Sequence, residues 1–160
     1  MINLSILLQK NAIAPIDWAA NTVKYFKAHQ LKIGICSSSS HEKVSAAIEY
    51  LGINKQIDAT QPAHKDVEGK PSPEPYLTTA IKLGENPKNC LTIEDSNAGV
   101  LSAKNAGMKV VFFSAPTKNL KSSNLADLTI SSLKELNVET ANKLFEKKYL
   151  RLKIWKPLIH

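Results

Sequence analysis

No hydrophobic run in this sequence approaches the roughly 20 residues that a membrane-spanning helix requires, so we expect no contact with the membrane interior. The apolar start, Ile2 to Leu8, has no basic residue before it and no small-residue cleavage site after it, which argues against a signal peptide. Cysteine is scarce, and Cys36 and Cys90 both lie in apolar runs. Such positions favour buried free thiols in a reducing cytoplasm, where we expect the protein to reside.

Positive charge is concentrated at the C-terminal end. The chain of 160 residues carries a formal charge of +7, but residues 142–160 hold six basic side chains and one acidic one, so the rest carries only +2. This balance argues against a nucleic-acid partner for the main body. We expect one globular domain at 1–141 and a basic extension at 142–160. We favour a solvated tail, although Tyr149 and Trp155 among its basic residues leave binding to nucleic acid or an acidic surface open.

Short apolar runs alternate with segments of helical periodicity through the middle of the chain. This alternation predicts an α/β fold with a parallel sheet covered by helices on both faces. Ser39 and Glu42 have the spacing of a capping box at the start of one helix. We expect strands at Leu31–Cys36, Ile57–Ala59, Cys90–Ile93, Lys109–Phe113 and Leu128–Ile130, and helices at Asp17–His29, His41–Leu51, Pro75–Leu83 and Asn97–Ala106.

Three polar clusters follow predicted strands, and ligands bind at the carboxyl ends of strands in open α/β sheets. The first is Ser37–Ser40, whose hydroxyls and backbone N–H groups form an anion site or simply cap the next helix. The second is Gly69-Lys70-Pro71, where a restrained backbone holds either a phosphate-binding charge or a solvated turn lysine. The third is Glu94-Asp95-Ser96, whose adjacent carboxylates suit a hard cation such as Mg²⁺, unless Asp95 or Ser96 only caps a helix.

The order of these clusters is more specific than any of them alone. A hydroxyl cluster, then a lysine in Gly-Lys-Pro, then Glu-Asp-Ser resembles motifs II, III and IV of the haloacid dehalogenase superfamily. The stretches Gly69–Tyr76, Ile93–Val100 and Ala103–Met108 are similar to the β-phosphoglucomutase-like branch. The resemblance covers about Ile16 to Phe113 and implies a Rossmann-like parallel sheet with helices on both faces.

The resemblance also implies roles for individual residues. Ser37 matches the motif II hydroxyl that holds the transferring phosphoryl group, and Ser38 and Ser39 match neighbours that contact substrate phosphate. Lys70 matches the motif III lysine, which neutralises charge on the nucleophile and the phosphoryl oxygens. Glu94 and Asp95 match the motif IV acids that hold Mg²⁺ directly or through water. This set implies a magnesium-dependent phosphatase or phosphohexomutase that acts on small phosphate esters such as sugar phosphates.

One part of the family pattern is missing. The family's nucleophile stands in motif I, Asp-x-Asp-Gly, after the first strand, and this sequence contains no Asp-x-Asp. The resemblance implies that the motif I strand and most of the helical cap would lie upstream of Met1. Because that strand is central in the family's sheet, its loss would leave unpaired backbone groups. Either Ile2–Leu8 fills the gap, or another chain fills it, or the fold is only marginally stable; alternatively, Ile2–Asn11 is the last cap helix.

Three functions therefore stay open. The first is an enzyme completed by a separate N-terminal half chain, the second a non-catalytic remnant that keeps the fold, and the third a binding module that uses the basic tail. An unfilled sheet would also favour self-association. We expect no catalysis by this chain alone, because a magnesium site without a nucleophile cannot form an aspartyl-phosphate. Substrate identity and the choice between phosphatase and mutase depend on the missing parts.

Overall fold

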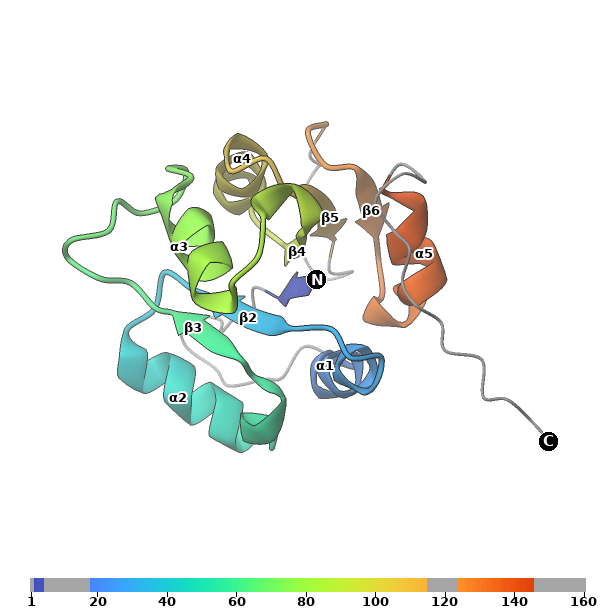
Figure 1. Ribbon diagram of the computed structural model, residues 1–160, viewed down its shortest axis with the longest axis horizontal. Helices are drawn as coiled ribbons and strands as arrows, with labels where there is room; N and C mark the ends of the chain where they lie inside the picture. The colour runs from blue at the N-terminus through green and yellow to red at the C-terminus, as the bar shows by residue number, and fades with distance from the viewer. Residues whose placement is uncertain (1, 5–17, 115–123, 146–160) are drawn as a thin grey trace.

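The computed structural model describes residues 2–4, 18–114 and 124–145. A six-stranded sheet in the order β3-β2-β1-β4-β5-β6 forms its centre, and each neighbouring pair is parallel (Figure 1). The α/β class with a parallel sheet is therefore confirmed. The strands are β1 Ile2–Leu4, β2 Ile33–Cys36, β3 Ala59–Gln61, β4 Leu91–Glu94, β5 Lys109–Phe113 and β6 Leu128–Ile130.

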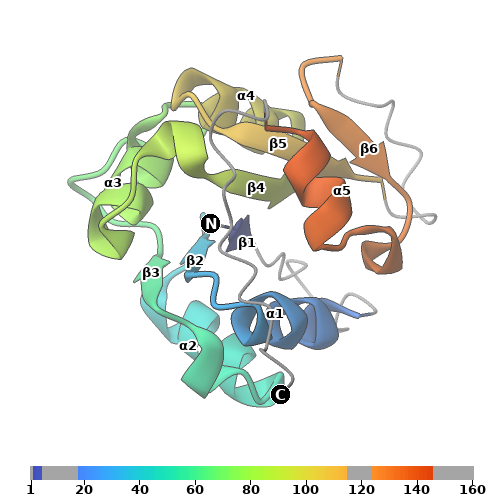
Figure 2. The same ribbon diagram turned by 45° about the vertical axis from the view of Figure 1, so that its right-hand side comes forward.

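Helices cover both faces of the sheet, and two apolar clusters form the core between them (Figures 1 and 2). Strand β5 shows why there are two clusters: Val111 and Phe113 belong to one and Val110 and Phe112 to the other, because successive strand residues point to opposite faces. Helices α1, α2 and α5 pack on the first cluster, and α3 and α4 on the second. The bounds are α1 Ala19–Ala28, α2 His41–Tyr50, α3 Glu74–Leu83, α4 Asn97–Asn105 and α5 Val138–Lys143, with 3-10 helices η1 Asn54–Gln56, η2 Pro87–Asn89 and η3 Leu133–Glu135.

The short strand β1 occupies the central position of the sheet. It pairs in parallel with β2, where Ile2 faces Ile33, and with β4, where Leu4 faces Ile93. Of the alternatives open for the N-terminal segment, a strand that fills the gap is thus confirmed for Ile2–Leu4, and a cap helix is wrong there. The three residues of β1 include no carboxylate, so the strand takes the place of the motif I strand without its nucleophile.

One predicted helix cap is wrong, and several predicted element bounds differ from the structure by one or two residues; for example, β2 begins at Ile33 rather than Leu31. Helix α2 begins at His41 with Ser40 as its N-cap, so the expected capping box of Ser39 and Glu42 is wrong. Glu42 stands one residue too early in the helix for that box, and a hydrogen bond with the Ser40 side chain lowers its pKa instead. Strand β3 begins at Ala59, two residues after the predicted start at Ile57, because the Asp58 carboxylate accepts a 2.7 Å hydrogen bond from the Ile33 N–H and ends the ladder there.

The C-terminal boundary stays a prediction. Helix α5 runs through residue 141, and Leu144 and Phe145 pack against the core. The rest of the predicted extension, with Tyr149 and Trp155, lies outside the described residues. Cys36 and Cys90 are buried and free, as expected.

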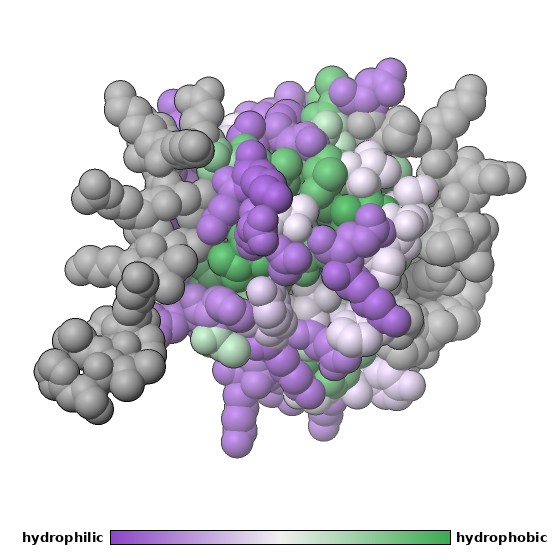
Figure 3. Space-filling view, turned by 90° about the vertical axis from the view of Figure 1, so that its right-hand side faces the viewer, coloured by the Kyte–Doolittle hydropathy of each residue, from purple (hydrophilic) through white to green (hydrophobic). Residues whose placement is uncertain are grey.

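The described surface is mixed in character. On the face with β6 and α5, hydrophobic areas lie between hydrophilic side chains (Figure 3). Within residues 18–114 and 124–145, no helix combines the length and the apolar content needed to cross a membrane.

Candidate phosphate and metal site at the carboxyl end of the sheet

The strand order places the polar clusters around one edge of the sheet. Numbered along the chain, the order 3-2-1-4-5-6 reverses direction at β1, and ligands of open α/β sheets bind at such a point, outside the carboxyl ends of the strands. Ser37 follows the last residue of β2, and Asp95 follows the last residue of β4. Only β1 stands between these two strands. The hydroxyl cluster and the acidic cluster are therefore neighbours in space.

Lys70 joins these two strand ends. It lies in the loop between β3 and α3, and its ammonium forms an ion pair with Glu94 Oε1 at the end of β4. The same ammonium donates a hydrogen bond to the backbone oxygen of Cys36 at the end of β2, at a distance of 3.5 Å. The side chains of Lys70 and Glu94 are 11% and 1% exposed. An ion pair so far from solvent is weakly screened, so it fixes the position of the lysine.

The Glu94 carboxylate is held by two further side chains. The Tyr76 hydroxyl donates to Oε1, and the Ser96 hydroxyl donates to Oε2 at 3.2 Å. Tyr76 is fully buried in the first turn of α3, and the Lys70 ammonium lies 4.9 Å from the centre of its ring. Donors to both carboxylate oxygens explain how a charged group is retained in the core, since a buried charge without partners is very costly.

The N-terminus of α4 approaches the same carboxylate. Ser96 is the N-cap of this helix and accepts a 3.0 Å hydrogen bond from the Gly99 N–H. A Cβ atom on Gly99 would overlap the Glu94 carboxyl group, so only glycine allows this approach. The helix capping considered for Asp95 or Ser96 is thus performed by Ser96. Asp95 lies buried between the strand and the helix, at 4% exposure.

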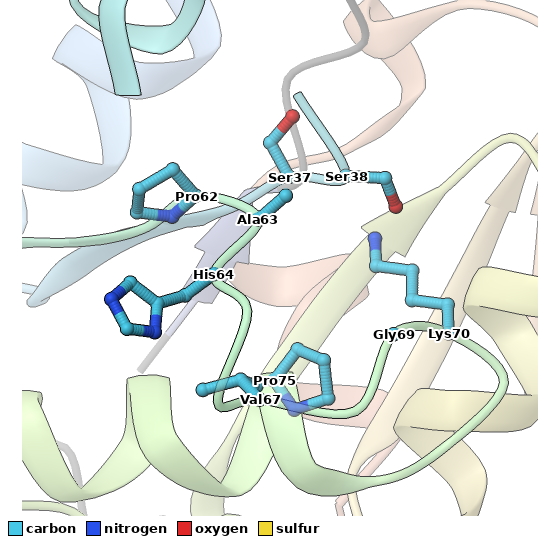
Figure 4. A pocket seen from close by; sticks show the side chains of 9 residues that line it. All are labelled: Ser37, Ser38, Pro62, Ala63, His64, Val67, Gly69, Lys70 and Pro75. Atoms are coloured by element: carbon cyan, nitrogen blue, oxygen red, sulfur yellow. The ribbon is translucent and has the colours of Figure 1, made fainter. Parts of the chain in front are cut away.

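A pocket of about 390 Å³ opens beside Lys70. In Figure 4 the Lys70 ammonium points toward Ser38 across it, and Ser37 stands at the same end. Ser39 is not part of the lining; its backbone N–H donates to Ser37 Oγ at 3.1 Å, and its carbonyl accepts from the Ala63 N–H at 2.9 Å. The lining residues are Ser37, Ser38, Pro62, Ala63, His64, Val67, Gly69, Lys70 and Pro75.

Cys36 is the only thiol near this pocket within the described ranges, and its environment keeps it protonated. Burial raises the pKa of the Cys36 thiol to about 11, against the opposing effect of the Lys70 charge. Because the thiolate is the nucleophilic form, Cys36 is a poor substitute for the missing aspartate at neutral pH.

The acidic pair fits a magnesium ion that keeps other oxygen ligands. In the part of the chain that the structure describes, no group of three or more His, Cys, Asp or Glu side chains gathers around one point. Glu94 and Asp95 supply two adjacent carboxylates, and Mg²⁺ is commonly bound by one or two carboxylates together with water and substrate phosphate. The donor set suits that ion better than one that needs a complete protein cage.

The structure brings Ser37, Ser38, Lys70 and Glu94 together at this end of the sheet. The Ser39 backbone bonds within the loop, and Asp95, next to Glu94 in the chain, is buried. Sequence reasoning missed Tyr76, Gly99 and His64. Tyr76 and Gly99 stand within the family-like stretches, but only their approach to Glu94 gives them a role. His64 carried no signal, because the loop before Gly69 has no regular pattern.

Known proteins resemble this chain over most of its length. The family model described as haloacid dehalogenase-like hydrolase matches residues 5–113. The bifunctional riboflavin kinase/FMN phosphatase of Arabidopsis thaliana is 31% identical over 82% of this chain and 35% of its own length. Hexitol phosphatase B of Escherichia coli strain K12 is 33% identical over 71% of this chain and 51% of its own length.

Solved structures agree with this assignment. The β-phosphoglucomutase of Clostridium difficile has a TM-score of 0.71 and 28% identity, over 81% of this chain and 56% of that protein. The chain thus spans between about a third and a half of the curated relatives named above. With the sheet order, the Lys70–Glu94 pair and these matches together, the chain belongs to the haloacid dehalogenase-like hydrolases, in their β-phosphoglucomutase-like branch.

Proposed function

We propose that this chain supplies the phosphate-binding and magnesium-binding part of a phosphoryl-transfer site for small phosphate esters, of the kind represented by sugar phosphates. One observation carries the proposal: Lys70 is paired with a buried Glu94 and lines a pocket together with Ser37 and Ser38. Phosphoryl transfer depends mainly on positioning and on neutralising charge, and these groups provide both.

Each residue has a defined task in this proposal. The Ser37 hydroxyl holds the transferring phosphoryl group, while Ser38 and the turn formed by Ser39 add hydrogen bonds to its oxygens. Lys70 neutralises negative charge on those oxygens from a fixed position. Glu94 and Asp95 hold Mg²⁺, which when bound supplies further positive charge to the phosphoryl oxygens. Tyr76 and Ser96 keep the Glu94 carboxylate oriented through their hydroxyls.

The nucleophile must come from outside the described residues. No residue of β1 is acidic, and the sequence has no Asp-x-Asp. A strand that brings the aspartate to the family position would have to displace β1, which contributes only three residues to the ladder. We therefore propose that a separate N-terminal segment supplies it, and that the chain alone is inactive. A non-catalytic remnant is the alternative.

Magnesium-dependent hydrolysis of p-nitrophenyl phosphate tests this proposal, first with the purified chain and then with an added polypeptide that carries an Asp-x-Asp strand. Calorimetric titrations with Mg²⁺ and inorganic phosphate report on the site whether or not turnover occurs. We expect binding that Asp95→Asn weakens, no turnover by the chain alone, and turnover in the mixture. Binding without turnover in the mixture favours the remnant. Activity of the chain alone that Asp95→Asn abolishes contradicts the proposed inactivity and makes Asp17 the first candidate nucleophile.

A further inference from the structure

The Lys70 ammonium lies between a candidate anion site and a carboxylate of the protein. On one side it points toward Ser38 across the pocket, where the proposed function places a phosphate (Figure 4). On the other side it forms an ion pair with Glu94, one of the two acids proposed to hold Mg²⁺. One positive charge therefore faces both a ligand anion and a protein carboxylate, and it cannot be fully available to both.

The Glu94 carboxylate opposes the Lys70 charge at close range. Both side chains are almost completely buried, so little water screens the pair. The hydroxyls of Tyr76 and Ser96 also donate to Glu94, but they carry no formal charge. Among these contacts Lys70 is the cation that balances Glu94, and the pair as a whole has almost no net charge with which to attract a phosphate.

The neighbouring Cys36 thiol responds to both charges. Burial is the largest influence on the pKa of Cys36, and beyond burial the Lys70 charge lowers that pKa whereas the Glu94 charge raises it. Cys36 ends β2 directly before Ser37, the residue proposed to hold the phosphoryl group. The two charges therefore oppose each other at the end of the strand where the anion is expected.

Lys70 has further contacts that keep it at the pocket. Its ammonium donates a hydrogen bond to the Cys36 backbone oxygen and lies 4.9 Å from the centre of the Tyr76 ring. An ammonium near an aromatic ring is attracted to it even when no carboxylate contributes. The charge of Glu94 can therefore be balanced by another cation while the lysine stays in place.

We propose that the Glu94 carboxylate neutralises the Lys70 charge until a divalent cation at Glu94 and Asp95 balances both acids, so that cation binding strengthens phosphate binding through Lys70. The one positive and two negative side chains leave a net charge of −1, which a divalent cation changes to +1. Phosphate is repelled by the first arrangement and attracted by the second. The inference rests on the proposed function, because it takes the phosphate to lie beside Ser37 and the cation beside the acids.

Phosphorus NMR titration of the purified chain with inorganic phosphate tests the coupling, first in EDTA and then in saturating Mg²⁺. We expect Mg²⁺ to tighten phosphate binding at least about tenfold, and phosphate to tighten Mg²⁺ binding by the same factor, because such coupling is reciprocal. Equal phosphate affinity in the two conditions overturns the inference but leaves the proposed function intact. If phosphate binds in neither condition, the proposed function is overturned and the inference with it.

Glu94→Gln, measured in EDTA, assigns the effect to the ion pair. The amide keeps the size of the side chain but cannot balance the Lys70 charge, so this variant should bind phosphate at least about fivefold more tightly than the parent does. Asp95→Asn is the matched control, because it removes the same formal charge from the next residue and leaves the Lys70–Glu94 pair in place. Its gain should stay below about twofold. Equal gains overturn the inference, because a general loss of negative charge would then explain both.

The double variant Lys70→Met/Glu94→Gln covers the case of a poorly folded Glu94→Gln protein, since it removes both charges of the pair. It replaces a neutralised pair by two uncharged side chains, so in EDTA its phosphate affinity should stay within about threefold of that of the parent. A larger loss would show that Lys70 acts on phosphate although Glu94 is present, and the inference would then be wrong.

Discussion

The Lys70 ammonium and the Glu94 carboxylate form an ion pair although 24 positions separate them in the sequence. The pair connects the loop after β3 to the end of β4, and the Cys36 carbonyl adds the end of β2. It therefore positions the candidate phosphate-binding charge and also ties three parts of the sheet edge together. Stability and ligand binding should consequently respond to the same substitutions at this place.

Replacing Lys70 tests this dual role. Lys70→Met leaves the Glu94 carboxylate buried without its cation, and we expect the free energy of unfolding to fall by about 3 kcal/mol. Urea denaturation at pH 7 measures the loss. The double variant Lys70→Met/Glu94→Gln should recover most of it, because no unpaired charge remains. The control is Lys82→Met, since the contact between the Lys82 ammonium and the Thr60 oxygen is exposed and its loss should matter by less than about 0.5 kcal/mol. If Lys70→Met and Lys82→Met lower the free energy of unfolding equally, the buried ion pair contributes no more to stability than the exposed contact does.

Gly99→Ala should be destabilising although alanine favours helices. Alanine gains about 1 kcal/mol over glycine in a helix, but its Cβ at this position would overlap the Glu94 carboxyl group. Overpacking of this kind costs about 1–3 kcal/mol, so we expect a net loss of stability together with weaker Mg²⁺ binding. Thermal unfolding and calorimetric titration provide the two measurements. Gly69→Ala is the control for stability, because among the described residues no atom beyond its two chain neighbours lies within 4 Å of the Cβ that it would add. A Gly99 variant as stable as the parent would contradict the close approach.

Proline at position 3 tests the central place of β1. Asn3 pairs with Gly34 on one side and Thr92 on the other. Because proline has no N–H and fits poorly inside a sheet, Asn3→Pro should lower stability by about 3 kcal/mol or more in urea denaturation. Asn3→Ala keeps the backbone N–H, so comparison with it isolates the contribution of the ladder. If the proline and alanine variants unfold at the same urea concentration, β1 does not hold the central position.

Asp127 should make stability sensitive to acid. Burial tends to raise the pKa of Asp127, but hydrogen bonds from Lys104, the Val110 N–H and Lys109 outweigh it and lower the pKa below the ordinary 3.8. The stabilisation is therefore fully present above pH 3.8 and is lost as the pH falls through the lower pKa of the folded state. We expect the unfolding free energy of Asp127→Asn to depend less steeply on pH than that of the parent between pH 5 and 2.5. Parallel curves for the two proteins would assign the acid sensitivity to other carboxylates, such as Asp58.

Local pattern in the sequence was sufficient for the regular elements of the fold. Lys109–Phe113 and Leu128–Ile130 are strands with the predicted bounds, and the helix before Gly84 ends at Leu83 as expected. These elements follow from apolar runs, periodicity and a glycine whose positive φ closes a helix, all of which act over a few residues. The order of the hydroxyl, lysine and acidic clusters also indicated the family, because that order is a property of the chain itself.

Contacts between distant segments were decided only by the tertiary structure. The segment Ile2–Leu4 is too short to distinguish strand from helix, and only pairing with β2 and β4 makes it the central strand. The hydrogen bond from Tyr76 to Glu94 likewise appears only when α3, packed against β2 and β3, brings Tyr76 to the end of β4. Much of the pocket lining comes from the loop between β3 and α3, which has no periodicity and whose shape depends on hydrogen bonds to Ser39 and Glu74. Sequence pattern determines which residues form an element, whereas burial and hydrogen bonding across the fold determine which of them meet.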